Sequence, residues 1–258
     1  MDIIKSGNSA YEEYERLLLK RDAFLKDGES ANLAYLQMFG SIQAKIYETK
    51  LECVKKKKTI EYIQSFINRG ENVDAADMRG FIDREMTSYY AELRRMLKEK
   101  KKADEATVSN PYEVKRSKEL YRRLAKLLHP DLNPHTDRNN ALSELWHRTR
   151  IAYACNDVKE LAEIEVLVRK VLRDLNIDGA RADIPDLKEK TEELKNEIYE
   201  ITTSEPYTYI ALLEDETAVN EKMSGLKAQL DEAKAYLAEL EKILKQIILT
   251  GGVNFDVR

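Results

Sequence analysis

The chain has 258 residues, of which nine are glycine and five are proline, and its formal net charge is −4. Charged residues make up 35% of the chain and aromatic residues 8%. Sandwiches, barrels and doubly wound sheets need frequent glycine and proline turns, so this composition argues against them and predicts an all-α fold of long helices. Two cysteines, Cys53 and Cys155, are too few for a disulfide framework or a cysteine-based zinc site.

No segment of the sequence is typical of targeting or of membrane insertion. Residues 1–7 lack the apolar core of a signal peptide. No apolar run approaches the roughly 18 residues that a membrane-spanning helix needs. We therefore expect a cytoplasmic protein with reduced thiols and with no membrane partner.

Residues 1–106 have the pattern of a long helical hairpin. A capping box at Ser9 and Glu12 predicts a first helix that ends near Asp27. A second helix is expected over residues 30–69, because apolar positions recur there in alternating steps of four and three. These positions are Tyr35, Phe39, Ile42, Ile46, Thr49, Cys53, Ile60, Ile63 and Ile67.

The return helix of this hairpin is predicted to begin after Asp74, a suitable N-cap residue that follows a stop at Gly70. A short connection between two long amphipathic helices makes them antiparallel. The hairpin is therefore expected to be an antiparallel coiled coil. The return helix has a second seam, formed by Ile82, Met86, Tyr89, Leu93 and Met96.

Residues 179–258 repeat this plan at the C-terminal end. Apolar residues keep heptad spacing over residues 187–201 and, without a slip, over residues 219–247. An interruption at Pro206 predicts a second antiparallel hairpin with Tyr207 near its tip. The same seams are compatible with a parallel homodimer, so the sequence leaves the oligomeric state open.

Residues 107–178, between the two hairpins, have the pattern of a small globular unit. A basic amphipathic helix is expected over about residues 113–128 and is ended by Pro130. Further helices are expected from near Asn140 and after a break at Asn156. A basic island in an acidic chain indicates a local acidic partner. The island consists of Lys115, Arg116, Lys118, Arg122, Arg123 and Lys126, against the single acid Glu119.

The connection after the basic helix carries His129, Pro130 and Asp131. Pro130 lacks an N–H group and fixes its own φ, so it ends the helix and moves His129 out of the helical region. Asp131 can offer both carboxylate oxygens to an arginine of a partner. By itself the tripeptide is also explained as a helix end followed by a turn. The helix before it has a row of basic residues spaced by four, which suits an acidic groove: Lys118, Arg122 and Lys126.

The string of residues 120–134 resembles the J domain of DnaJ-type co-chaperones. In that family a basic helix carries Tyr-x-x-Leu-Ala, here starting at Tyr121, and His-Pro-Asp follows after three residues. The next helix of the family carries an aromatic anchor and then Ala-Tyr. Trp146, Ala152 and Tyr153 stand at the matching positions. The resemblance covers roughly residues 111–157, under a fifth of the chain.

The resemblance implies a partner rather than a reaction. J domains dock on the ATPase domain of a DnaK-type chaperone and accelerate its ATP hydrolysis, and they hold no nucleotide, cofactor, metal or catalytic group. We therefore expect a co-chaperone that is not an enzyme and whose hairpins bind a client or target. The residues expected to contact the DnaK-type partner, by signature, position or charge, are His129, Pro130, Asp131, Lys118, Tyr121, Arg122, Lys126 and Asn133.

The sequence also departs from the family pattern. The short first helix of the family has no counterpart just before Pro111, so the end of the first hairpin is expected to replace it, unless the unit is pared down. Leu132 stands where the family often has a basic residue, and Thr149 stands at a usual core position. A Gly/Phe-rich linker and repeated Cys-x-x-Cys motifs are absent from the sequence, which assigns client choice to the hairpins.

Other interpretations compete with a J domain. The three histidines and Cys155 match no common zinc-ligand spacing. Cys155 and His147 do not share a helix face, as a nucleophile pair would require. Nucleic-acid binding by the basic helix is disfavoured, because the net charge is negative and no aromatic residues interleave with the basic ones. The main alternative is a structural or scaffolding coiled-coil protein in which the J-like unit is a non-functional packing module.

Overall fold

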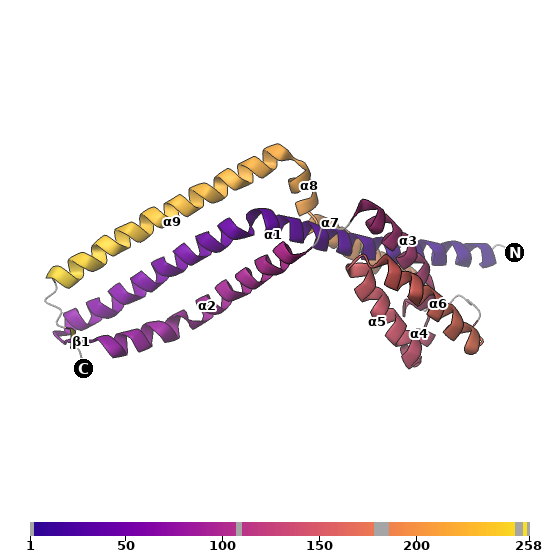
Figure 1. Cartoon of the computed structure of the whole chain (residues 1–258), viewed down its shortest axis with the longest axis horizontal. Coiled ribbons are helices and arrows are strands. Elements are labelled where there is room, and N and C mark those ends of the chain that lie inside the picture. Colours follow the sequence, from indigo (N-terminus) through magenta and orange to yellow (C-terminus); the bar gives the residue numbers. More distant parts are fainter. Residues whose placement is uncertain (1–2, 107–109, 178–185, 251–254, 257–258) are drawn as a thin grey trace. The chain divides into compact units, whose positions relative to one another are not determined.

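The computed structural model describes residues 3–106, 110–177, 186–250 and 255–256 (Figure 1). These residues form nine helices and one parallel bridge of two residues per strand, between β1 (Val73–Asp74) and β2 (Phe255–Asp256). The fold is therefore all-α, as the sequence predicts. None of the helices within the described ranges combines the length and the apolar composition that crossing a membrane requires.

The described helices belong to two compact units. Unit 1 spans Met1–Ala31 and Thr107–Ile210, and unit 2 spans Asn32–Ala106 and Ala211–Arg258. This division differs from the three consecutive segments expected from the sequence, 1–106, 107–178 and 179–258. The difference arises because helix α1 (Ile3–Arg69) is continuous and contributes residues to both units.

The predicted end of the first helix near Asp27 and Gly28 is therefore wrong. Gly28 keeps the negative φ of a helix, whereas Gly70, where α1 does end, has φ of +69°. The backbone at Gly28 lies close to another segment of unit 1, since an added Cβ would be 3.5 Å from the backbone nitrogen of Tyr207. Gly28 is thus an interior residue of α1 that packs near Tyr207, and it is not a helix end. The predicted capping box involves Ser9, whose side chain lies outside the described residues.

Unit 2 contains the later part of α1, α2 (Ala75–Glu105) and α9 (Glu216–Thr250), which run side by side in Figure 1. Asp74 caps α2 as predicted, its carboxylate accepting the N–H groups of Ala76 and Asp77. Leu51, Ile82 and Met86 form the buried centre of the contact between α1 and α2.

The seam of α9 packs in unit 2. Its residues Leu226, Ala233 and Leu240 are buried, and the Cys53 thiol of α1 donates to the Ala233 carbonyl at 3.6 Å. The seam of α7 (Leu187–Thr203) packs elsewhere, against the first part of α1 in unit 1, where Leu194 is buried.

The second hairpin expected from the sequence, a pairing of α7 with α9, is therefore wrong. A heptad seam shows that a helix has a partner but does not say which helix that partner is. Here α1 is the partner in both cases. The predicted helix end at Gly251 and Gly252 lies outside the described residues.

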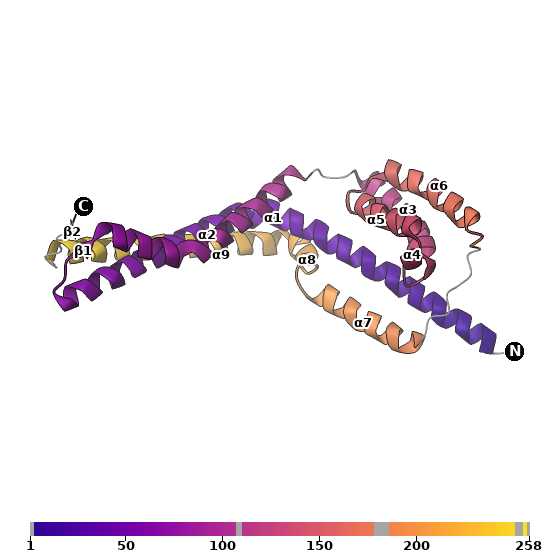
Figure 2. The same cartoon turned by 90° about the horizontal axis from the view of Figure 1, so that it is seen from below.

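The core of unit 1 lies between α3 (Pro111–Leu128), α5 (Asn140–Ala154) and α6 (Val158–Asp174), with the short α4 (His135–Arg138) before α5. Helix α8 (Tyr209–Glu214) follows α7, and the division between the units falls within it. Figure 2 shows α7 on one side of the first part of α1 and α3–α6 on the other. Thr149 is fully buried in this core, and its hydroxyl donates to the Leu145 carbonyl at 2.7 Å, so the polar group is satisfied.

The helix that packs on α3 and α5 comes from the start of the chain. Leu19 of α1 packs against the core of these helices, and the Lys26 ammonium donates to the Tyr153 carbonyl at 2.5 Å. The sequence had assigned this packing to the end of the first hairpin, and Leu19 and Lys26 of α1 provide it instead.

Candidate docking site

The site is built at the turn between α3 and α5, two antiparallel helices. Ser117 and Asn156 are hydrogen bonded at one end of this helix pair, at 2.8 Å, and His129 meets Trp146 towards the other. Pro111 occupies the first turn of α3 and Asn110 caps it, and His129 is the C-cap, in an extended conformation (φ −62°, ψ 127°). Pro130 explains this helix end, as the sequence predicts.

The turn that follows α3 is ordered by its own hydrogen bonds. The His129 carbonyl accepts the N–H groups of Leu132, at 2.9 Å, and of Asn133, at 2.7 Å. The Asn133 side chain donates back to the Leu127 carbonyl at 2.7 Å. Asn133, a predicted contact residue, therefore also fixes the shape of the turn.

Two features of the His129 environment favour the neutral imidazole. Its ring meets Trp146 edge-on, with ring centroids 5.0 Å apart, and only 7% of the residue is exposed. Burial lowers the pKa of His129, and the nearby carboxylates of Asp22 and Asp131 only partly oppose this. Its Nδ1 accepts the N–H of Asp131 at 3.1 Å, which places the ring proton on Nε2. Burial and hydrogen bonding therefore favour the same protonation state.

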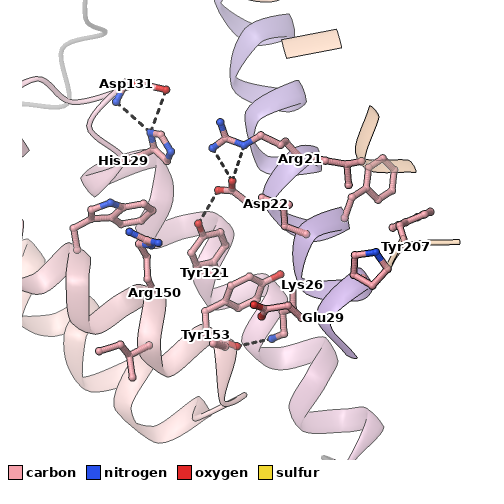
Figure 3. Close-up of a pocket in the computed structure, with 18 of the residues that line it drawn as sticks. Arg21, Asp22, Lys26, Glu29, Tyr121, His129, Asp131, Arg150, Tyr153 and Tyr207 are labelled. Carbon is pink, nitrogen blue, oxygen red and sulfur yellow. Dashed lines mark hydrogen bonds and ion pairs between the residues drawn. The ribbon is translucent and has the colours of Figure 1, made fainter. Parts of the chain in front are cut away.

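Tyr121 lies in the middle of the site. Its ring stacks on Tyr153, with centroids 3.9 Å apart and planes 11° apart, and its hydroxyl donates to the Asp22 carboxylate at 2.7 Å (Figure 3). Burial, with Asp22 beside it, raises the pKa of Tyr121. Tyr121 thus connects α3 to both α5 and α1 through contacts that leave its hydroxyl already bonded.

The predicted basic row on α3 also meets α1. Lys118 pairs with Asp27 at 2.8 Å and Lys126 pairs with Glu15 at 2.6 Å, whereas Arg122 is exposed and has no ion-pair partner among the residues that the structure describes. The sequence correctly placed these three residues on one helix. It did not indicate that another part of the same chain would contact two of them.

Lys26 of α1 is buried where α1 crosses α3 and α5. Its ammonium lies 3.7 Å from the centre of the Tyr153 ring and donates to the Asn156 side chain at 2.5 Å. Burial lowers the pKa of Lys26 to about 8, and nearby Lys118 adds to this effect. A cation at this depth is satisfied by a carbonyl, an amide oxygen and an aromatic face together, so it fixes α1 against the C-terminal end of α5.

A groove of about 880 Å³ runs beside the His-Pro-Asp turn (Figure 3). His129, Pro130 and Asp131 line it, so the structure brings the signature residues to one open surface. Sequence reasoning missed the residues that line the rest of the groove, because they come from distant segments. They include Arg21, Asp22, Phe24, Arg150, Pro206 and Tyr207.

The position of Tyr207 corrects a prediction. Tyr207 packs edge-on against Phe24 of α1, with ring centroids 5.1 Å apart, and lines the groove. It therefore does not lie at the tip of a second hairpin.

The acids of α1 that meet α3 carried no motif that could have identified them, since only their spacing on one helix sets them apart.

No family model matches the chain, and neither a curated protein nor a solved structure matches it. Within the described ranges, no group of three or more His, Cys, Asp or Glu side chains is placed to hold a metal ion. The functional interpretation therefore depends on the residues and the geometry of the turn itself.

Proposed function

We propose that this protein is a J-domain-type co-chaperone, which docks on the ATPase domain of a DnaK-type chaperone and accelerates its ATP hydrolysis. The observation that carries this proposal is the ordered His-Pro-Asp turn between two antiparallel helices. In that turn His129 is fixed against Trp146, while 48% of the Asp131 side chain is exposed beside an open groove. An exposed carboxylate on a rigid turn is suited to a bidentate hydrogen bond with an arginine of the partner.

The chain itself carries out no chemistry in this proposal, because the ATPase supplies the catalytic groups. The helices of unit 2 then bind a client or a target protein and bring it to the DnaK-type chaperone. We assign the protein to the cytoplasm, where DnaK-type chaperones act on unfolded chains. The free thiols of Cys53 and Cys155 are consistent with a reducing compartment.

The decisive experiment measures single-turnover ATP hydrolysis by a purified DnaK-type chaperone in the presence of the full-length protein. We expect His129→Gln to abolish the stimulation, because the substitution removes the imidazole that orders the turn. The matched control is His135→Gln, which changes an exposed histidine of the same loop region and should keep full stimulation. Equal stimulation by the wild type and by His129→Gln would exclude docking through this turn.

A second candidate function is a scaffold whose J-like unit only packs. The observation in its favour is that Lys118 and Lys126 already pair with carboxylates of α1. A scaffold would leave ATP hydrolysis by the DnaK-type chaperone unchanged, for the wild type and for every variant of the turn. The same assay therefore separates the two functions.

A further inference from the structure

The first part of α1 covers the face of α3 that the proposed function assigns to the DnaK-type partner. Three acids of α1 meet three residues of α3 in antiparallel order. Glu15 meets Lys126 at 2.6 Å and Asp22 accepts the Tyr121 hydroxyl at 2.7 Å. Asp27 meets Lys118 at 2.8 Å. One helix of the chain thus supplies the acidic surface that the basic row was predicted to find on a partner.

The cover extends over the His-Pro-Asp turn. The Tyr14 hydroxyl donates to the Asp131 carboxylate at 3.3 Å. Leu132 is 3% exposed and packs in a cluster with residues of α1 and with Leu194 of α7. At this position the J-domain pattern often has a basic residue. The leucine is explained by its burial under α1 and α7.

The ion pairs between α1 and α3 are weak enough for the acids of a partner to replace those of α1. The side chain of Lys126 is 51% exposed and that of Glu15 is 21% exposed, and the values for Lys118 and Asp27 are 29% and 35%. Ion pairs that remain in contact with water contribute little to stability and are screened by salt. An acidic partner surface could therefore replace Glu15 and Asp27 without leaving a buried lysine unpaired.

We propose that the first part of α1, from Tyr11 to Asp27, is an intramolecular cover that competes with the DnaK-type chaperone for α3 and for the adjacent turn. This inference rests on the proposed function and adds its regulation. Docking requires the contacts of α1 with Lys118, Lys126 and Asp131 to open. Stimulation is then limited by the fraction of molecules in which the cover is open.

The test uses the full-length double variant Glu15→Gln, Asp27→Asn, which removes two charges of the cover and leaves α3 unchanged. The matched control is Glu189→Gln, Glu193→Gln, which removes two charges from exposed positions of α7. Limited acetylation read by mass spectrometry reports whether Lys118 and Lys126 become accessible, with exposed Lys170 as the internal reference. Affinity for a purified DnaK-type chaperone and single-turnover ATP hydrolysis report docking.

We expect acetylation of Lys118 and Lys126 to increase in the cover variant, with affinity for the DnaK-type chaperone rising about three- to tenfold. The control should behave as the wild type. The proposed cover is overturned if acetylation does not increase. It is also overturned if the wild type docks in a His129-dependent way and the variant, with its lysines accessible, docks no better. If neither protein docks although the lysines have become accessible, the proposed function itself fails.

Discussion

At the scale of single residues, His129 couples the shape of the turn to its protonation state. The ring is buried against Trp146 and accepts the Asp131 N–H at Nδ1. Protonation would place a charge in an apolar contact and would also remove this acceptor. Burial in the folded state therefore favours the neutral imidazole, and the neutral ring supplies one of the hydrogen bonds of the turn.

This coupling predicts a loss of stability in mild acid. Burial lowers the pKa of folded His129 below its ordinary value of 6.5, so the unfolded chain binds the proton first as the pH falls. Where the unfolded state holds more protons, the free energy of unfolding decreases with decreasing pH. The contribution of neutral His129 to the free energy of unfolding is complete above about pH 6.5. It is lost as the pH falls from there to the lowered pKa of folded His129.

The measurement is urea unfolding of the wild type and of His129→Gln at about pH 7.5 and about pH 5.5. We expect the free energy of unfolding to fall more steeply in the wild type, since glutamine does not titrate. His135→Gln provides the control, because it removes an exposed histidine and should keep the steeper decrease. Parallel decreases in the wild type and His129→Gln would contradict a buried, neutral His129.

At the scale of secondary structure, the continuity of α1 through Gly28 has a measurable consequence. A glycine inside a helix costs roughly 0.5–1 kcal/mol relative to alanine. An alanine Cβ at Gly28 would meet its nearest neighbours at 3.5–3.6 Å, which is ordinary van der Waals contact. We therefore expect Gly28→Ala to increase the free energy of unfolding by about 0.5–1 kcal/mol.

Gly70→Ala, directly after the end of the same helix, is the opposite case. Its φ of +69° suits glycine, so an alanine there should lower the free energy of unfolding by about 1 kcal/mol. Urea unfolding followed by far-UV circular dichroism compares both variants with the wild type. A destabilising Gly28→Ala would contradict a helical Gly28 with room for a methyl group.

These two glycines show which features of the helices could be predicted from the sequence. Ends that depend on local chemistry were predicted correctly, including the cap at Asp74 and the stops at Gly70 and Pro130. Gly28 looked like another stop because glycine often ends helices, whereas α1 runs through it and packs there near Tyr207, about 180 residues away. Its environment is set by tertiary contact, which a single sequence does not encode locally.

At the scale of the whole molecule, the helix type of each segment was predictable and its partner was not. Heptad spacing correctly indicated that α7 and α9 each have a packed face, on which Leu194, Leu226, Ala233 and Leu240 are buried. It could not show that α1 would pack against α3, α7 and α9, because heptad spacing does not identify the partner helix. The same limit applies to the docking site. The turn residues were found by their motif, while the acids that cover them had no signature.

The distribution of charge in the folded chain leads to the last prediction. The basic island on α3 was expected to meet an acidic partner, and most of its members pair with acids of the same chain. Lys118 and Lys126 pair with α1, Arg116 with Glu119, and Arg123 with Glu165. Binding to nucleic acid gains free energy by releasing counterions around phosphates, which requires cations that are not already neutralised.

We therefore expect the wild type not to bind a fluorescently labelled DNA duplex or RNA strand, as measured by anisotropy at about 50 mM salt. Low salt makes the assay most sensitive to binding, because contacts with phosphates are strongest at low salt. Binding that weakens steeply as salt is added would mean that these ion pairs open towards phosphates as readily as towards a protein. In that case the basic face of α3 would select its partner by charge alone. The acids of α1 would then compete with nucleic acid for this face, and not with a chaperone.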